Sequence, residues 1–309
     1  SFALLVYVSA WLKCHHPAAF CCGLMNSLPM GFYSPSQLIQ DAQRHGIEVR
    51  PLRVAHSHWD HRLERGPKGQ WAIRLGLRLV SGFNPEAATR IATARDTTPF
   101  RNLQDLKERA ALSARELDAL VQADALADLA GHRAQTQWEA AAIAPPAPLL
   151  GALERDTKSN LHDGVIRPAP SVVMEVIQDY DATGLTLKAH PMQLLRADPR
   201  FRRCLRAIDL PHLNHGRFVR MAGVVTGRQR PGTAQGIIFL TLEDETGNTN
   251  VVVKTDVQDR CRKALLQSRI ALIKGTVENR EGVVHVLAGQ IEDVSDALAG
   301  LAAGSRDFH

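Results

Sequence analysis

The spacing of hydrophobic positions follows a helical period over the first half of the chain and a strand-like alternation over the last third. Residues 1–13 are almost continuously apolar, which predicts a buried helix. Pro17 ends this helix and can occupy the first turn of a second one, which extends through Asn26. We expect a helical hairpin taken from a larger context rather than a secretory signal, because no basic leader or cleavage site flanks the apolar run.

Breaker residues place the next elements. Ser34 is typical of an N-cap, and Gln37 completes a capping box at the start of a helix that precedes Gly46. The alternation in WAIRL (71–75) predicts a strand that forms a hairpin with the segment around His61 and Leu63.

A tight turn at Ser81, Gly82 and Phe83 separates a short apolar helix from a second helix that Asn84 caps and Pro85 begins. This is a helix-hairpin-helix pattern. Glycine lets the turn direct backbone N–H groups outward beside a helix N-terminus, which makes a donor site for a phosphate. Such a site contacts the nucleic-acid backbone and not the bases. A glycine turn also occurs in plain helical bundles, so that alternative stays open.

A second unit of the same kind is expected after the first. Ser113 caps a helix and Glu116 closes its capping box. The helix then breaks near Asp124 and Ala125 before another apolar turn. The hairpin glycine expected at this break is missing from the sequence.

The chain changes character after the helical region. The alanine- and proline-rich stretch at 141–150 predicts a linker, and the segment at 157–197 predicts one helix around 172–180 without assignable chemistry. From Arg217 onward, five alternating segments with one helix between the third and fourth predict a five-stranded OB-fold β-barrel. The loop TGRQRPGT (226–233) joins strands one and two, which is a ligand-binding loop in this fold.

Charge concentrates in front of and inside this predicted barrel. The net charge is only +5, but between 200 and 230 a single acid, Asp209, faces a run of arginines: Arg200, Arg202, Arg203, Arg206, Arg217, Arg220, Arg228 and Arg230. The planar guanidinium fork suits phosphate oxygens, so we expect a polyanion as partner, with a plain solvated face as the alternative. Aromatic residues make up only 5%, so electrostatics must carry most of the binding. The barrel candidates for DNA contact are Arg217, Arg220, Arg228, Arg230 and Lys254.

Cysteine and histidine gather in WLKCHHPAAFCC (11–22), which raises the question of a metal site. Zinc sites favour spaced pairs, whereas Cys14, His15 and His16 are consecutive and Cys21 and Cys22 are adjacent, so their side chains diverge. We expect a packed helix end and no metal. Five cysteines without repeated spacing indicate a reducing compartment, the cytoplasm, and no apolar run is long enough for a membrane span.

Several long, collinear stretches carry a family resemblance: SFALLVYVSAWLKCHHPAAF, MGFYSPSQLIQDAQRHGIEVRP, GLRLVSGFNPEAATRIATAR, VVTGRQRPGTAQGIIFLTLEDETGNTNVVV and SRDFH. They resemble the C-terminal part of bacterial C-family DNA polymerases, specifically the error-prone paralogue of the polymerase III alpha subunit. The resemblance implies a multidomain α+β chain: the end of the fingers domain (1–58), a tandem helix-hairpin-helix module (59–140), a linker and poorly patterned segment (141–198), the OB-fold (199–296) and a C-terminal tail (297–309).

The resemblance also implies what this chain lacks. The paired palm carboxylates that hold Mg²⁺ in such polymerases lie upstream of the matched region, so we expect no catalytic residue and no cofactor here. The cluster at 243–245 is expected to be turn residues rather than a metal site. Lys13 and His15 are expected contacts to template or nucleotide. No clamp-binding peptide is recognised, so the implied partners are DNA, accessory mutasome proteins and, through them, the sliding clamp.

Together these features predict the C-terminal DNA-binding region of an error-prone DNA-directed DNA polymerase that acts in damage-induced mutagenesis and translesion synthesis. Two alternatives remain open. One is a stand-alone, non-catalytic DNA-binding repair accessory built from the same hairpins and barrel. The other is an OB-fold RNA binder of the anticodon-recognition kind, for which the hairpin module would be superfluous.

Overall fold

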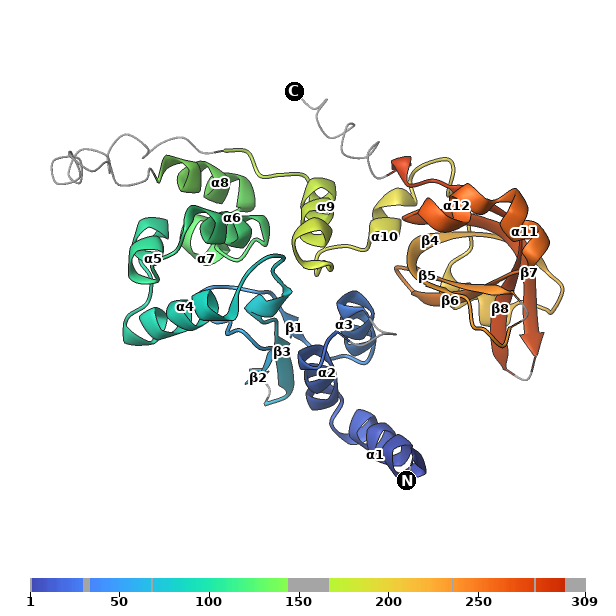
Figure 1. Cartoon of the computed structure of the whole chain (residues 1–309), viewed down its shortest axis with the longest axis horizontal. Coiled ribbons are helices and arrows are strands. Elements are labelled where there is room, and N and C mark those ends of the chain that lie inside the picture. The colour runs from blue at the N-terminus through green and yellow to red at the C-terminus, as the bar shows by residue number, and fades with distance from the viewer. Residues whose placement is uncertain are drawn as a thin grey trace. The chain divides into compact units, whose positions relative to one another are not determined.

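The computed structural model describes residues 2–29, 34–67, 69–143, 167–234, 236–280 and 282–297. The chain divides into two compact units, Ser1–Ser171 with Ile177–Leu187, and Val172–Val176 with Lys188–His309. Figure 1 shows the elements of each unit. Residues 144–166 of the predicted linker and poorly patterned segment (141–198) and the predicted tail beyond Ala297 lie outside the described residues.

The first unit combines helices with a small sheet. Its elements are α1 (Phe2–His15), α2 (Pro17–Asn26), α3 (Pro35–Arg44), β1 (Val49–Arg50), β2 (Arg62–Arg65), β3 (Trp71–Arg74), the 3-10 helix η1 (Leu77–Leu79), α4 (Pro85–Thr97), α5 (Leu103–Arg109), α6 (Ala114–Gln122), α7 (Ala127–Ala130) and α8 (Arg133–Ala142). Helix α9 (Val172–Thr183) runs across the division between the units.

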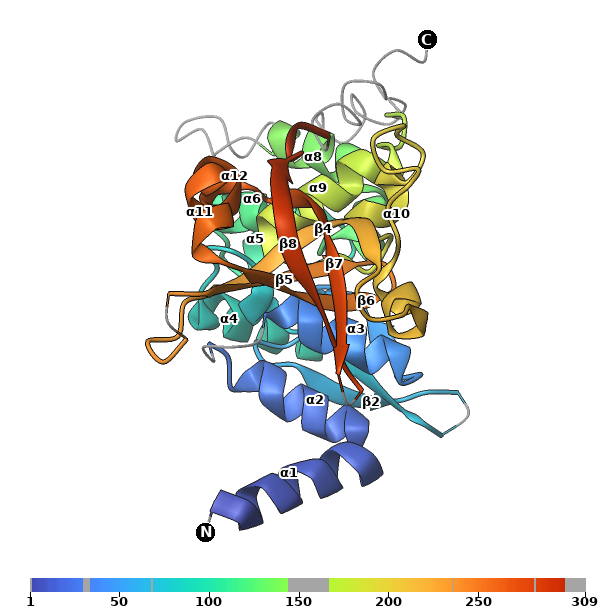
Figure 2. The same cartoon turned by 90° about the vertical axis from the view of Figure 1, so that its right-hand side faces the viewer.

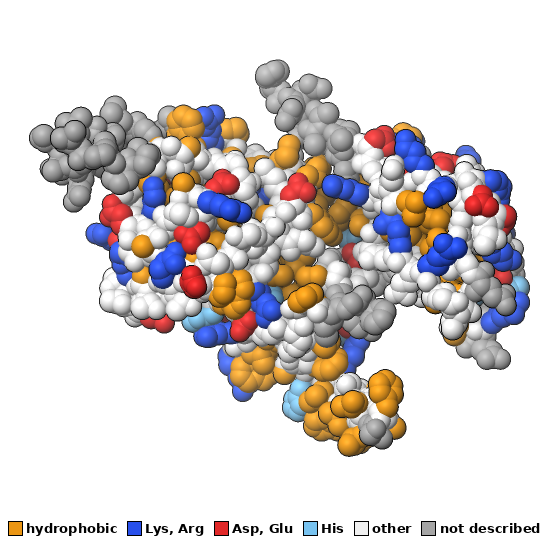
Figure 3. Space-filling model, viewed as in Figure 1, with side chains coloured by type: hydrophobic (Ala, Val, Ile, Leu, Met, Phe, Trp, Pro, Cys, Tyr) orange, Lys and Arg blue, Asp and Glu red, His pale blue; other side chains and the backbone are white. Residues whose placement is uncertain are grey.

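The predicted helical hairpin is present, but the expectation that its first helix is buried is wrong. No residue of α1 is buried, and Phe2 and Tyr7 are 76% and 66% exposed. Figure 3 shows hydrophobic side chains gathered on this helix at the bottom of the view. The reason is that α1 is apolar around its circumference and among the described residues only α2 contacts it through several positions. One neighbour cannot cover all sides of a helix.

Local signals in the sequence place the next elements well. The capping box at the start of α3 is confirmed, since Ser34 Oγ accepts from the Gln37 N–H and the Gln37 side chain accepts from the Ser34 N–H. The hairpin of β2 and β3 is confirmed with Leu63 opposite Ile73. The sequence did not indicate that β1 pairs in parallel with β3, which gives the sheet order β1-β3-β2.

One hydrophobic core joins the predicted segments 1–58 and 59–140. It includes Met25 of α2, Ile39 of α3, Ile73 of β3, Ile91 of α4 and Leu120 of α6, all at most 1% exposed. The helical hairpins therefore stand on the same packed base as the sheet and α3. This shared core fixes the position of the turn at Gly82 relative to α6.

The second unit is built around a closed barrel. Its elements are α10 (Pro191–Leu195), the 3-10 helix η3 (Ala207–His212), β4 (Phe218–Gln229), β5 (Ile238–Asp244), β6 (Gly247–Val253), α11 (Thr255–Arg260), α12 (Arg262–Gln267), β7 (Ile270–Arg280) and β8 (Val283–Asp293). The strand order β4-β5-β6-β8-β7, with α11 and α12 between the third and fourth strands, confirms the OB-fold prediction. Figure 2 shows α11 and α12 beside one end of the barrel.

The segment before the barrel packs against its outer surface. Met192, Leu195 and Phe201 form a buried cluster with Ala222 of β4 and Leu272 of β7. The barrel interior is a separate cluster. The part of the predicted segment 141–198 that follows Leu187 therefore belongs to the barrel unit.

Candidate nucleic-acid interface

The first hairpin turn has the conformation that the sequence predicts. Gly82 has a φ of +71°, a conformation that favours glycine, and Asn84 Oδ1 accepts from the Ala87 N–H at 2.7 Å to cap α4. Phe83 is 8% exposed, so its side chain belongs to the core and cannot contact a ligand directly. Ser81, Gly82 and Asn84 remain at the surface.

The protein itself uses two of the backbone donors in this turn. The Phe83 N–H donates to the Val80 carbonyl at 3.1 Å, and the Ser81 N–H donates to the Ala182 carbonyl of α9 at 2.9 Å. Within the described part of the chain, the Gly82 N–H has no hydrogen-bond acceptor. The turn alone therefore offers a ligand fewer donors than the pattern suggested.

Ser81 and Gly82 line a pocket of about 320 Å³ in the first unit. Its other walls come from α6, including Arg115, and from the end of α9. The sequence gave no reason to single out Arg115, because the helix that carries it is about thirty residues from the turn along the chain.

A second hairpin is present, but its turn does not lie at the break near Asp124, where the sequence has no glycine. Gly131, with a φ of +76°, connects α7 to α8, and His132 caps α8 through a hydrogen bond from the Gln135 N–H at 3.3 Å. The break near Asp124 is real, but the turn lies seven residues further on. The signal was available, since Leu-Ala-Gly-His at 129–132 parallels Val-Ser-Gly-Phe at 80–83.

A buried ion pair fastens this second hairpin to α9. Arg133, at the start of α8, is 1% exposed and its Nη2 bonds to Asp179 Oδ1. The other Asp179 oxygen accepts from the Thr186 hydroxyl at 2.8 Å. Because α9 also supplies the Ala182 carbonyl at the first turn, it links both hairpins of the module.

Half of the arginine run is engaged within the barrel unit. Arg200 bonds to Asp198 and Asp296, Arg206 bonds to Asp209, and Arg220 Nη2 donates to the Arg200 carbonyl at 3.0 Å. These contacts leave less free charge than the sequence indicated. Among the described residues, the exposed arginines of this run without a hydrogen bond or ion pair through the side chain are Arg202, Arg203, Arg217 and Arg230.

Arg228 occupies an unexpected place. It pairs with Leu240 of β5, which is buried in the barrel interior, but Arg228 itself is exposed. Its Nε donates to the Leu265 carbonyl at 2.7 Å and its Nη2 donates to the Ser268 carbonyl, which caps the end of α12. Only the remaining donors, on Nη1 above all, are open to a ligand.

Arg230 and Lys254 lie near the same loop. Arg230 and Thr255 both approach Gly236. Arg230 Nη2 lies 3.7 Å, and Thr255 Cγ2 lies 3.4 Å, from the place that a Cβ atom at residue 236 would take. Gln258 of α11 holds this loop by donating to the Gly236 carbonyl at 2.8 Å. Lys254, directly before α11, is therefore close to Arg230, and both are exposed. Arg217 does not belong to this group. It directly precedes β4, and its carbonyl accepts from the Val277 N–H of β7.

The two candidates on α1 have partners in the same unit. Lys13 Nζ forms an ion pair with Asp41 of α3 at 2.9 Å, and the His15 ring lies 4.6 Å from the Trp11 ring. Both residues are exposed. A contact from Lys13 to a phosphate would compete with Asp41.

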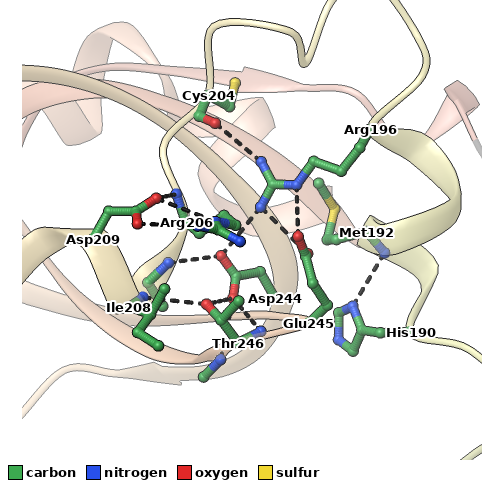
Figure 4. Close-up of polar contacts among 12 residues, drawn as sticks. His190, Met192, Arg196, Cys204, Arg206, Ile208, Asp209, Asp244, Glu245 and Thr246 are labelled. Carbon is green, nitrogen blue, oxygen red and sulfur yellow. Dashed lines mark hydrogen bonds and ion pairs between the residues drawn. The ribbon is translucent and has the colours of Figure 1, made fainter.

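The acidic cluster at the turn between β5 and β6 is a structural joint. Asp244 is 2% exposed, and it accepts from the Ala207 N–H at 2.8 Å, the Thr246 N–H at 2.8 Å and Arg196 Nη2 at 3.2 Å. Arg196 Nε also bonds to Glu245 at 2.9 Å (Figure 4). These carboxylates hold the segment before the barrel against β5. The sequence indicated turn residues here and did not reveal this burial.

The cysteines of the zinc-like stretch are divided between surface and core. Cys14 is exposed, whereas Cys21 and Cys22 are buried. Burial raises the pKa of the Cys21 thiol to about 12, and its Sγ lies 3.5 Å from the Leu38 carbonyl. The described residues contain no group of three or more histidine, cysteine, aspartate or glutamate side chains that could hold a metal ion. No helix in the described ranges is long and apolar enough to cross a membrane.

Two family models match the chain where these features lie. A helix-hairpin-helix motif model matches residues 46–136, and an OB-fold nucleic acid binding domain model matches residues 219–294. The chain is therefore an α+β protein that combines a helix-hairpin-helix region with a five-stranded OB-fold barrel.

Curated relatives match the chain over its whole length. Error-prone DNA polymerases from Teredinibacter turnerae, Saccharophagus degradans and Pseudomonas aeruginosa match this chain with sequence identities of 50%, 48% and 49%. Each match covers 100% of this chain. The chain spans 30% of the length of each of these relatives. It corresponds to a region of the bacterial error-prone DNA polymerases. A solved asparaginyl-tRNA synthetase from Pyrococcus horikoshii shares 28% identity over 29% of this chain and 23% of its own, with a TM-score of only 0.26.

Proposed function

We propose that this chain is the region of an error-prone DNA polymerase that holds DNA while another part of the protein performs synthesis. The observation that carries the proposal is the match over the full chain, at 50% identity, to one region of an error-prone DNA polymerase. The tandem hairpins suit the backbone of duplex DNA, and the barrel loop with Arg230 and Lys254 suits a single strand. Neither module reads base sequence in this proposal.

The parent protein would use Mg²⁺ on its palm carboxylates for nucleotidyl transfer. Among the residues that the structure describes, no group of three or more histidine, cysteine, aspartate or glutamate side chains could hold a metal ion. The proposed cellular role is translesion synthesis in damage-induced mutagenesis, in the bacterial cytoplasm, together with accessory mutasome proteins that provide the link to the sliding clamp. This role is supported by the relatives, which are error-prone DNA polymerases.

Binding of labelled duplex and single-stranded oligonucleotides to the chain, measured by fluorescence anisotropy over a range of salt, tests the DNA-holding role. We expect binding to both, and reversal of Arg230 and Lys254 to glutamate should flatten the log-log salt slope by roughly 0.7 per lost single-strand phosphate contact. The matched control reverses Arg202 and Arg203, which changes the net charge equally. If the chain ignores both oligonucleotides even at low salt, the proposal fails.

The same assay separates the RNA-binding alternative. An anticodon-type binder would prefer transfer RNA, so unlabelled transfer RNA should displace DNA at lower concentrations than unlabelled duplex does. We expect the opposite order, because the hairpin module contacts duplex phosphates. A mutation-frequency assay with the full-length protein, with and without the Arg230 and Lys254 reversals, tests the mutagenesis role after DNA damage.

A further inference from the structure

The pocket beside the first hairpin turn is lined by an arginine whose side chain has no partner among the described residues. Arg115 lies near the start of α6, and its Nη2 is 3.8 Å from the position of a Cβ built on Gly82. Its side chain is exposed, and within the described residues no carboxylate lies within 4.0 Å of its nitrogens. Neither does any carbonyl in that part of the chain accept a hydrogen bond from it.

This isolation is unusual within the first unit. Four other arginines close to the hairpins donate to backbone carbonyls: Arg53, Arg90, Arg95 and Arg109. The nearest carboxylate in sequence, Glu116, is held by Ser113 at 2.8 Å, by Arg90 at 3.0 Å and by Asn84 at 3.2 Å. Glu116 is therefore committed to the joint between α4 and α6 and leaves Arg115 unpaired.

The backbone of the turn explains what Arg115 adds. The N–H groups of Ser81 and Phe83 are already bonded inside the unit, so Gly82 is the central donor left at the turn. One neutral N–H is a weak anion site, whereas a guanidinium offers several charged donors to the oxygens of one phosphate. Because Gly82 has no side chain, no atom of residue 82 screens its backbone from the guanidinium, whose Nη2 lies 3.8 Å from where a Cβ would be.

We propose that Arg115 is a phosphate-binding residue, and that its guanidinium and the Gly82 N–H hold the same phosphodiester group of duplex DNA. Asp118 and Asp181 line the same pocket and disfavour an anion that fills it. The fitting ligand is thus a single backbone phosphate at the Gly82 side, rather than a free triphosphate. This inference rests on the proposed DNA-holding function and assigns a contact within it.

The first test compares Arg115→Gln with Arg62→Gln. Arg62 is a matched control, because it is an exposed arginine on β2 of the same unit whose side chain has no hydrogen bond or ion pair among the described residues. We expect Arg115→Gln to weaken duplex binding roughly tenfold and to flatten the salt slope by about 0.9, as for one lost phosphate. Arg62→Gln should change both much less. Equal effects of the two variants would overturn the assignment.

The second test asks whether Arg115 and Gly82 share one phosphate. Gly82→Ala and Arg115→Gln should be non-additive when combined, because the second change removes a contact that the first has already broken. Arg115→Gln and Arg230→Gln lie in different units and should be additive. Additivity of Gly82→Ala with Arg115→Gln would overturn the shared phosphate. If the unaltered chain does not bind duplex at all, the proposed function fails; if it binds and Arg115→Gln changes nothing, only this inference fails.

Discussion

His61 is a buried side chain whose charge state the fold controls. It is 3% exposed, and its Nδ1 accepts the Gly76 N–H at 3.1 Å, so the neutral ring fits and a protonated ring would lose this bond. Burial, together with the nearby charge of Arg78, lowers the pKa of His61 to about 4. Asp60 opposes this shift only in part.

We expect the first unit to lose stability as the pH falls from about 6.5 to about 4. The folded-state pKa lies below the unfolded one, so the stabilisation is complete above 6.5 and disappears as protons bind the unfolded chain. The loss should reach about 3 kcal/mol. Denaturation followed by tryptophan fluorescence measures it, because Trp11, Trp59, Trp71 and Trp138 all lie in this unit.

The control for this titration is His61→Asn, which keeps an acceptor for the Gly76 N–H but cannot gain a proton. We expect the variant to lose much of the pH dependence between pH 6.5 and 4. An unchanged slope would show that other groups, such as His58, cause the effect. Burial and the neighbouring charges of Arg62 and Arg95 also lower the pKa of His58.

Arg228 and Arg230 are two residues apart, but of the two only Arg228 has side-chain hydrogen bonds among the described residues. Arg228→Gln should lower the stability of the barrel unit by about 1–3 kcal/mol, because the carbonyls of Leu265 and Ser268 lose a charged donor. Arg230→Gln should leave stability nearly unchanged and weaken DNA binding. Thermal unfolding and anisotropy measured on the same two variants check the separation. The opposite pattern would restore Arg228 as the main contact of this loop.

At the scale of elements, α9 holds the hairpin module through a buried charge pair. Arg133→Met should destabilise the first unit by about 3–5 kcal/mol, because it leaves Asp179 buried without its cation. The double variant Arg133→Met with Asp179→Leu should recover much of that loss. Guanidinium denaturation followed by the fluorescence of Trp138, which lies on α8 with Arg133, measures both. A single variant as stable as the original would show that the pair does not support the joint.

Capping and alternation allowed the main elements to be predicted from the sequence. The caps at Ser34, Asn84 and Ser113 depend on residues three positions away, and the barrel strands depend on a period of two. Such signals are local, so they can be recognised in the sequence without knowledge of the fold. The glycine of the second hairpin was missed for a different reason, because it lies beyond the first helix break, at Gly131.

The roles of individual arginines could not be predicted, because they depend on distant chain segments. Arg133 meets Asp179 across 46 positions, and Arg228 meets Ser268 across 40. Composition alone cannot distinguish an arginine that donates to the carbonyls at a helix end from one whose guanidinium is available to bind a phosphate. Arg115 was not among the predicted site residues, because the sequence does not show that it lies close to Gly82. The packing of α6 against α4 brings the two residues together.

At the scale of the whole molecule, the two units report through different signals. All four tryptophans belong to the hairpin unit, whereas the barrel unit contains none. Unfolding followed by tryptophan emission therefore follows one unit, and far-ultraviolet circular dichroism follows both. We expect the two curves to differ in midpoint, because each unit has a core of its own. Coincident curves would instead indicate one cooperative transition.

Helix α1 should govern how the isolated polypeptide behaves at high concentration. Its 14 residues present Phe2, Leu4, Leu5, Val6, Tyr7, Val8, Trp11 and Leu12 to water. Self-association would hide this surface, so the hydrodynamic radius should grow with concentration, while a form without residues 1–15 should keep a constant one. A constant radius for both forms would mean that this exposed apolar helix does not cause self-association, and preparations of the region would then need no detergent.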